Sequence, residues 1–527
     1  MPASSAHRNC SNNRALGSTK REKYHYRGPF YPKIQSLPTE LVLEIFLQYC
    51  AICEGQVEAR SKVSRTKPLK PHSWIIRITH VCSLWRNVAI SYPLLWSLVR
   101  PCEPALFSTI LGRSQEALLS VEFSDRYGDM KFDSQDLDRI LRRELHRVER
   151  LSLQGRLLED VKRKYGKQWL YTLMTNTTSI RSLSVSRIDF CDVSALSQPK
   201  LSSLSLNFRR HTSVELQPTL TSLLDVLSKL PSLTSLYLQN LPALCGTPKS
   251  ANKVSLGKLN YLQLSGNLLA CHGLLRFLNL RPQVRVFLDY WENLLTMTSV
   301  IDVIDLLGST FYPSGATDVS NPLASLSFMQ GGPYINIQGW TSPVLAQDFS
   351  NRVTQGKAKF HFKIKSRPQY CETWMKHLHT RLRLDHIESL HISQASGHGD
   401  TETNTWASIR AAIRETFGNS TSLHTLAVCG VDSYHLASLL DYSSPYLKLD
   451  CGLFPELKHV LAADILWPDK SRSHPVGYSV LSALQMRRNL LPLLTLHRRH
   501  INLAQSYIID NIIPFVEGLN LTGICLC

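Results

Sequence analysis

The sequence lacks the patterns that would assign a chemistry directly. No stretch approaches the ~18 uninterrupted apolar residues of a membrane span, and the N-terminal MPASSAHRNCSNNRALGSTK has no apolar core of a secretory signal. The phosphate-binding patterns G-x-x-x-x-G-K-[ST] and G-x-G-x-x-G are missing, as are G-x-S-x-G and H-E-x-x-H. We therefore expect a non-enzyme with no catalytic residues, no cofactor and no membrane partner.

Acidic residues are outnumbered by basic ones, 41 against 59, so the formal net charge is +18. The excess is local, because residues 1–33 contribute +6 and residues 60–77 contribute another +6. A charge placed in two short stretches does not indicate a nucleic-acid-binding fold, and we expect no nucleic-acid partner. We predict a disordered basic tail over 1–33 and a solvated basic insert at about 54–72. A nuclear signal or an RNA-contacting arm is the alternative for these segments.

The thirteen cysteines, an odd number without a signal sequence, favour reduced thiols and a cytoplasmic or nuclear location. Cys50 and Cys53 form a C-x-x-C pair that is followed by His72, His80 and Cys82. Four such ligands can hold zinc, but a single C-x-x-C is a weak signal and Cys82 falls on an apolar helical pattern. We predict no metal site and interpret the cysteines as small buried apolar residues.

Leucine is abundant and periodic, and 27 leucines fall within residues 201–300. The recurring unit is L-x-x-L-x-L, whose alternation is typical of a short strand. Several copies follow a helical pattern, as TLTSLLDVLSKLP (219–231) precedes LTSLYL. The copies are VERLSL, IRSLSV, LSSLSL, LTSLYL, LNYLQL, LASLSF, IESLHI, LHTLAV and, less regularly, LKHVLA.

A strand and a helix that recur every 20–36 residues predict an α/β solenoid, because one unit cannot bury its apolar face alone. This region resembles the leucine-rich-repeat family in its longer, irregular versions. The resemblance implies a horseshoe over 146–470, preceded by a connector over 101–145 and followed by a helical cap over 471–527. An ordinary α/β domain with leucine-rich strands is the alternative.

Two gaps interrupt the repeat. VRVFLDY (284–290) is consistent with a degenerate strand, whereas the region 330–385, which begins with GGPYINIQGW, lacks the motif. It is either an insert at a binding face or a plain loop. Outward-facing x positions of the repeat are the candidate target-binding residues: Ser203, Ser205, Tyr237, Gln239 and Gln263.

The segment before the repeats reads as helices. Ser36 is a good N-cap and Pro38 suits the first helical turn, after which Leu37, Leu41 and Ile45 recur at helical spacing. A second helix is predicted over about Trp74–Ala89, and Pro93 ends the helical pattern.

LPTELVLEIF and, further on, ITHVCSLWRNVAISYPLLWSLV together resemble the F-box motif over residues 36–98. The resemblance implies a three-helix module within 34–100 that docks on a Skp-type adaptor and, through it, on a cullin-RING ligase. The implied adaptor-binding residues are Leu37, Pro38, Leu41, Ile45, Phe46, Val81, Cys82, Trp85, Leu94 and Trp96. The stretch between the two halves is longer than in a compact F-box, as in some fungal F-box-like proteins.

These resemblances together predict the substrate receptor of a Skp–cullin–F-box ubiquitin ligase, with the repeats binding an unidentified target protein. The receptor would act by proximity rather than by bond chemistry. The alternative is a non-ligase scaffold that uses the same repeats for protein binding.

Overall fold

The computed structural model describes nearly two thirds of the 527 residues. The described residues are 37–63, 72–124, 140–196, 198–209, 219–244, 246, 253–290, 297–312, 322–331, 334–345, 348, 357–365, 370–394, 403–430, 436, 439–440, 454–463, 493–497 and 519–522. The predicted tail 1–33 and residues 64–71 of the predicted insert lie outside them.

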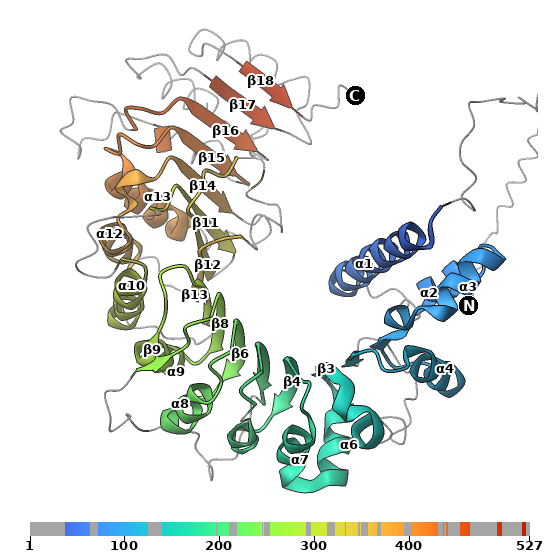
Figure 1. Ribbon diagram of the computed structural model, residues 1–527. Helices are drawn as coiled ribbons and strands as arrows, with labels where there is room; N and C mark the ends of the chain where they lie inside the picture. Colours follow the sequence, from blue (N-terminus) through green and yellow to red (C-terminus); the bar gives the residue numbers. More distant parts are fainter. Residues whose placement is uncertain are drawn as a thin grey trace, which may run out of the picture.

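The chain is mixed α/β, as predicted, and is organised around one large, mostly parallel sheet. The strand order is β1-β2-β3-β4-β5-β6-β8-β10-β13-β12-β11-β14-β15-β16-β17-β18, and β7 pairs with β9 in a small second sheet. Figure 1 shows that the large sheet curves into an arc, with strands along its inner side and helices α6 to α13 along its outer side. We call the inner side the open face.

The strands are short and follow one another across the arc. Their bounds are β1 Leu98–Val99, β2 Leu119–Phe123, β3 Val148–Leu153, β4 Ser182–Ile188, β5 Ser203–Phe208, β6 Ser235–Leu241, β7 Val254–Ser255, β8 Tyr261–Gly266, β9 Leu278–Asn279, β10 Arg285–Tyr290, β11 Ser325–Gly331, β12 Tyr334–Trp340, β13 Phe360–Lys365, β14 Ser389–Gln394, β15 Thr425–Cys429, β16 His459–Ala463, β17 Leu493–His497 and β18 Leu519–Thr522.

The helices and short helical turns lie between them. They are α1 Thr39–Val63, α2 Ser73–Thr79, α3 Ser83–Ser91, η2 Pro93–Trp96, α4 Pro104–Ser114, η4 Ile140–Glu144, η5 Leu145–Arg147, α6 Arg156–Tyr165, η6 Gly166–Gln168, α7 Trp169–Asn176, η7 Phe190–Ala195, α8 Leu220–Ser228, α9 Leu268–Phe277, α10 Met297–Phe311, α12 Cys371–Leu382, η10 Leu384–His386 and α13 Thr403–Phe417. Thr219 and Asn267 cap α8 and α9 by accepting backbone N–H bonds from Ser222 and Ala270.

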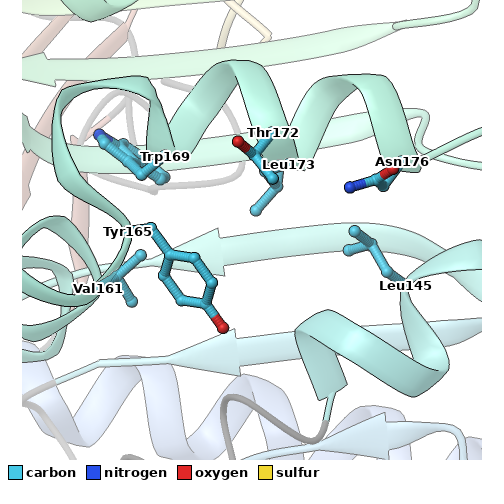
Figure 2. A pocket seen from close by; sticks show the side chains of 7 residues that line it. All are labelled: Leu145, Val161, Tyr165, Trp169, Thr172, Leu173 and Asn176. Carbon is cyan, nitrogen blue, oxygen red and sulfur yellow. The ribbon is translucent and has the colours of Figure 1, made fainter.

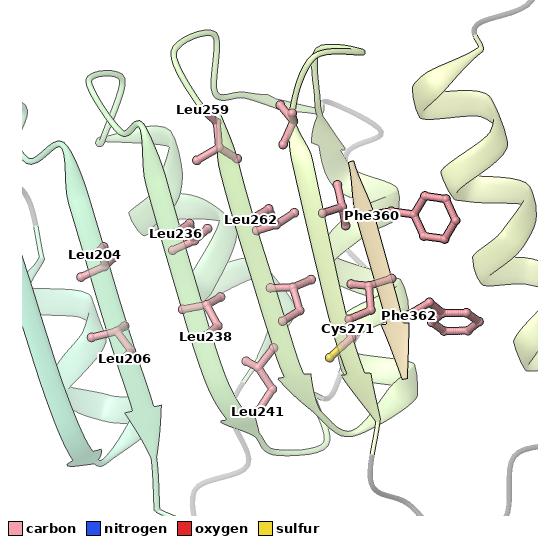
Figure 3. Packing of buried hydrophobic residues seen from close by; sticks show 14 of the residues in the cluster. Leu204, Leu206, Leu236, Leu238, Leu241, Leu259, Leu262, Cys271, Phe360 and Phe362 are labelled. Atoms are coloured by element: carbon pink, nitrogen blue, oxygen red, sulfur yellow. The ribbon is translucent and has the colours of Figure 1, made fainter. Parts of the chain in front are cut away.

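The leucines of the repeat form the core. In β5, Leu204 and Leu206 are buried while Ser203 and Ser205 are half-buried, because successive strand residues point to opposite sides of the sheet. Register keeps the leucines aligned from strand to strand, as Leu204 pairs with Leu236 on β6. Figure 3 shows these side chains as continuous rows across the neighbouring strands. Burial of the rows against the helices drives the stacking of the units.

The sheet begins earlier than predicted. The expected connector 101–145 contains α4 and the strand β2, and β1 already pairs in parallel with β2. Trp96 and Val99 are buried in the same apolar core as the leucine rows, so the N-terminal helices are continuous with the first strands. The helix predicted over Trp74–Ala89 is two helices, α2 and α3, separated at residues 80–82.

The region that lacked the motif lies within the sheet. VRVFLDY forms β10, as its alternation predicted, and GGPYINIQGW supplies β12, which pairs antiparallel with both β11 and β13. The plain-loop alternative is therefore wrong for residues 334–340. The helical cap predicted over 471–527 is not what the described residues there form, since β17 and β18 continue the parallel sheet.

Candidate functional site

Helix α1 carries apolar residues on two different faces. Leu41, Ile45 and Ile52 are 52%, 41% and 57% exposed. At 100° per residue, offsets of 4 and 11 positions bring these three side chains to within about 40° of one direction. We call Leu41, Ile45 and Ile52 the α1 stripe. A helix that exposes such a stripe has an apolar surface beyond the one it needs for its own packing.

The other face of α1 packs against the neighbouring N-terminal helices, which together with α1 we call the helical module. Val42 and Phe46 are fully buried, and Cys50 is nearly so. The Phe46 ring meets the Trp85 ring edge-on, with centroids 4.9 Å apart, so α1 packs against α3 through this pair. Phe46 is predicted to contact a partner, and in the described conformation its side chain is part of the core.

The break between α2 and α3 is set by the residues at 80–82. His80 ends α2, and Cys82 adopts an extended conformation in which its Sγ accepts the N–H of Trp85 at 3.5 Å. Cys82 is therefore the N-cap of α3 rather than a member of a continuous helical stripe. Val81, the residue between them, is turned outward and is 56% exposed.

Trp96 fixes the helical module to the sheet. It is only 3% exposed, its Nε1 donates to the Ala89 carbonyl at 2.7 Å, and the Arg113 guanidinium lies 4.4 Å from its ring centroid. These contacts come from α3 and α4, so Trp96 serves as an internal anchor. Trp96 is also predicted to contact a partner, and in this conformation its side chain is buried.

The ten predicted partner-contacting residues thus divide by exposure. Pro38, Leu41, Ile45, Val81 and Leu94 are exposed, Leu37, Cys82 and Trp85 are half-buried, and Phe46 and Trp96 are buried. Sequence reasoning missed exposed Ile52 and Ile76, although the spacing of 7 between Ile45 and Ile52 signals the first.

Exposed apolar side chains are concentrated in these helices. Seven of the eleven large hydrophobic residues that are exposed in the described part of the chain fall between residues 41 and 94. They are Leu41, Ile45, Leu47, Ile52, Ile76, Val81 and Leu94. The remaining four are scattered singly, and single exposed hydrophobic residues need no explanation. The N-terminal concentration marks a candidate docking surface.

The five residues predicted to bind a target all lie half-buried on the open face. Ser205 on β5 is in register with Tyr237 on β6, and Tyr237 is in register with Gln263 on β8. Ser203 lies two residues before Ser205 on β5, and Gln239 lies two residues after Tyr237 on β6, so both side chains point to the same face. The structure therefore brings these five side chains onto one surface.

Tyrosine is the distinctive residue of that surface. Burial raises the pKa of Tyr237 and raises that of Tyr261 to about 12, so both phenols stay neutral at physiological pH. The Tyr261 hydroxyl donates to Gln263 Oε1 at 3.1 Å. Tyr261 was not among the predicted residues, although it occupies an x position of LNYLQL.

Two histidines further along the sheet, the half-buried His361 and the buried His391, are neutral. Burial lowers the pKa of His361 and His391 to about 4, and His391 Nδ1 shares a 2.9 Å hydrogen bond with Ser327 Oγ. Within the residues that the structure describes, no group of three His, Cys, Asp or Glu side chains could hold a metal. His72, which was weighed as a zinc ligand, is buried, with a pKa lowered to about 4 mainly by burial.

A small pocket lies between η5, α6 and α7 on the outer side (Figure 2). It is lined mainly by apolar side chains and has a volume of about 30 Å³, far below the size of a cofactor site. Its polar members, Tyr165, Thr172 and Asn176, do not form a set of acid, base and nucleophile. The pocket therefore indicates no chemistry.

Among the described helices, none combines the length and apolar character needed to cross a membrane. No protein-family model matches the sequence, and no curated protein matches it either. The two candidate sites are therefore inferred from their own residues. One is an exposed apolar surface on the N-terminal helices, and the other is a polar, tyrosine-bearing surface on the open face.

Proposed function

We propose that the chain is the substrate-recognition subunit of a Skp–cullin–F-box ubiquitin ligase. The N-terminal helices, as an F-box module, dock on a Skp-type adaptor, and the curved α/β region, as a leucine-rich-repeat solenoid, binds the target protein. The single observation that carries the proposal is the concentration of exposed apolar residues on the helices that bear the F-box-like sequence.

The α1 stripe supports docking for an energetic reason. Covering an isoleucine or leucine fully contributes about 1.5–3 kcal/mol, so three half-exposed side chains supply several kcal/mol when a partner covers them. The same helix already has a packed inner face at Phe46, so its own fold does not require the stripe. Large apolar anchors of this kind dominate the affinity of protein interfaces.

The curved region supports the second half of the proposal. Strands recur in register, with helices along the outer side, and the polar x positions collect on the open face. Such a surface binds a protein without bond chemistry. The subunit then acts by holding the target close to the ligase, which raises the effective concentration of the acceptor lysines.

The proposal is tested by measuring the affinity of the full chain for a purified Skp-type adaptor. Ile45→Asp places a carboxylate in the α1 stripe, and we expect binding to fall by at least a hundredfold, because the apolar contact is lost and a charge is desolvated. Leu269→Asp is the matched control, since Leu269 on α9 is 70% exposed and lies far from the module.

Each outcome is decisive. Binding that is lost with Ile45→Asp and kept with Leu269→Asp supports adaptor docking through the stripe. Equal binding by both variants contradicts the assigned surface. No binding by the folded wild-type chain contradicts the ligase function and leaves a leucine-rich-repeat scaffold.

A further inference from the structure

Four aromatic rings from adjacent strands form a continuous row of ring contacts on the open face. Tyr237 and Tyr261 have ring centroids 4.8 Å apart, Tyr261 and Phe287 are 4.9 Å apart, and Phe287 and His361 are 5.7 Å apart. The rings come from β6, β8, β10 and β13, which are neighbours in the sheet. We call Tyr237, Tyr261, Phe287 and His361 the aromatic ladder.

The sheet does not need these rings for its packing. Strand β5 has Ser205 in register with Tyr237, and β6 has Ser235 in register with Tyr261. The same positions on β4 are Ser184 and Ser182. Since serine satisfies the same sites in neighbouring strands, the half-buried rings are a property of the surface. Clustered aromatic side chains on a surface are typical of binding sites.

The apolar surface ends on the far side of Phe287. Phe287 packs against a small second cluster of Trp340, Val344 and Ala358, separate from the main core. Ser325 Oγ holds the segment after β12 in place, because it accepts the N–H of Val344 at 2.8 Å and donates to the Ser342 carbonyl at 3.1 Å. The open face thus passes from a serine-rich region on β4 and β5 to the ladder, and then to this cluster.

Positive charge flanks the ladder. The Arg285 guanidinium lies 5.6 Å from the Tyr261 ring centroid, and exposed Arg150 lies in the same row of the open face on β3. The two acidic residues on this part of the face are neutralised. Glu122 pairs with Arg100 at 2.9 Å, and Asp289 pairs with Lys363 at 3.4 Å. Arg285 and Arg150 thus place two guanidinium groups on the described open face between β3 and β10.

We infer that the aromatic ladder binds an extended acidic segment of the target protein, one that carries an aromatic or long aliphatic side chain among its carboxylates. The apolar side chain packs on Tyr237, Tyr261 and Phe287, and the carboxylates lie near Arg285 and Arg150. Serine hydroxyls of β4 and β5 hydrogen-bond to the segment. This inference rests on the proposed function for its statement that the segment belongs to a ligase target.

The inference is tested by selecting a random-peptide display library on the full chain and, in parallel, on the variant Tyr237→Ser/Tyr261→Ser. The substitutions reproduce the residues of β5 and β6, so the sheet is expected to fold, which circular dichroism checks. We expect the wild-type chain to enrich acidic peptides with an aromatic or leucine residue. The variant should bind the most enriched peptide roughly a hundredfold more weakly.

A second measurement separates charge from apolar contact. Fluorescence anisotropy of the most enriched peptide should give about fivefold weaker binding with Arg285→Gln and no change with Arg276→Gln, an exposed arginine on α9. Affinity should also fall with added salt. Enrichment of basic, neutral or phosphate-dependent peptides overturns the inference, as does equal binding by the ladder variant or no enrichment.

The adaptor does not take part in this experiment. A failed adaptor assay together with ladder-dependent peptide binding would refute the ligase function and keep the acidic-peptide surface. The reverse result would refute only the ladder.

Discussion

Two neighbouring residues of α1 should differ in how strongly their substitution by alanine destabilises the helix. Ile45 is 41% exposed, whereas Phe46 is fully buried and meets Trp85 at a centroid distance of 4.9 Å. We predict that Phe46→Ala opens the helical module and that Ile45→Ala leaves it intact. The pair tests whether the α1 stripe is a surface of the folded chain.

The magnitudes follow from burial. Truncating a fully buried phenylalanine costs about 3–5 kcal/mol, because transfer free energy is lost and a cavity is left facing Trp85. Truncating Ile45 removes a side chain that is already partly solvated, and alanine is the better helix former, so the net cost should stay below about 1 kcal/mol. The expected difference is about 3 kcal/mol between adjacent positions.

Hydrogen–deuterium exchange of peptides from residues 39–53 measures this locally, without assuming that the long chain unfolds in one step. Phe46→Ala should lower the protection of α1 by more than a hundredfold, and Ile45→Ala by less than fivefold. Protection in β5 and β6 is the internal control and should not change. An Ile45→Ala variant as unprotected as Phe46→Ala would refute the reasoning, since Ile45 would then be a core residue.

Three further predictions concern stability. Burial lowers the pKa of His72 and His391 to about 4, so between pH 6.5 and pH 4 the unfolded chain binds protons that the folded chain excludes. Urea denaturation should therefore give the full free energy of unfolding above about pH 6.5. That free energy should fall towards pH 4 by about 1.4 kcal/mol per pH unit for each histidine. Gly266→Ala should lower the melting temperature, because a Cβ there would lie 2.4 Å from the Leu241 nitrogen at φ +142°, whereas Gly112→Ala in α4 should raise stability by about 0.5–1 kcal/mol. Cys82→Ser should preserve the α3 cap and Cys82→Ala should cost about 0.5–1 kcal/mol by calorimetry.

Sequence periodicity predicted the strands well because each one is a local pattern with a shared role. The L-x-x-L-x-L copies place buried leucines such as Leu204 and Leu236 on successive strands. Sequence periodicity did not predict burial or capping where a contact with another residue decides it. Phe46 and Ile45 are both apolar and adjacent, and Phe46 is the one whose side chain packs against Trp85 on α3. Cys82 fits a helical stripe by spacing, yet its thiol caps a new helix. The ladder was missed because its rings, separate in sequence, meet only through strand register.

The glycine-rich segment GGPYINIQGW shows why composition alone did not predict a strand. Gly339 on β12 is in register with Phe360 on β13, and a Cβ at Gly339 would lie 2.3 Å from the Phe360 ring. The missing side chain makes room for a cross-strand aromatic ring, so glycine stabilises this pairing where it would usually weaken a strand. The antiparallel strand that results carries Trp340, against which Phe287 packs. A sequence feature typical of loops therefore determines where the aromatic ladder ends, and Gly339→Val should displace Phe360 and weaken peptide binding together with the sheet.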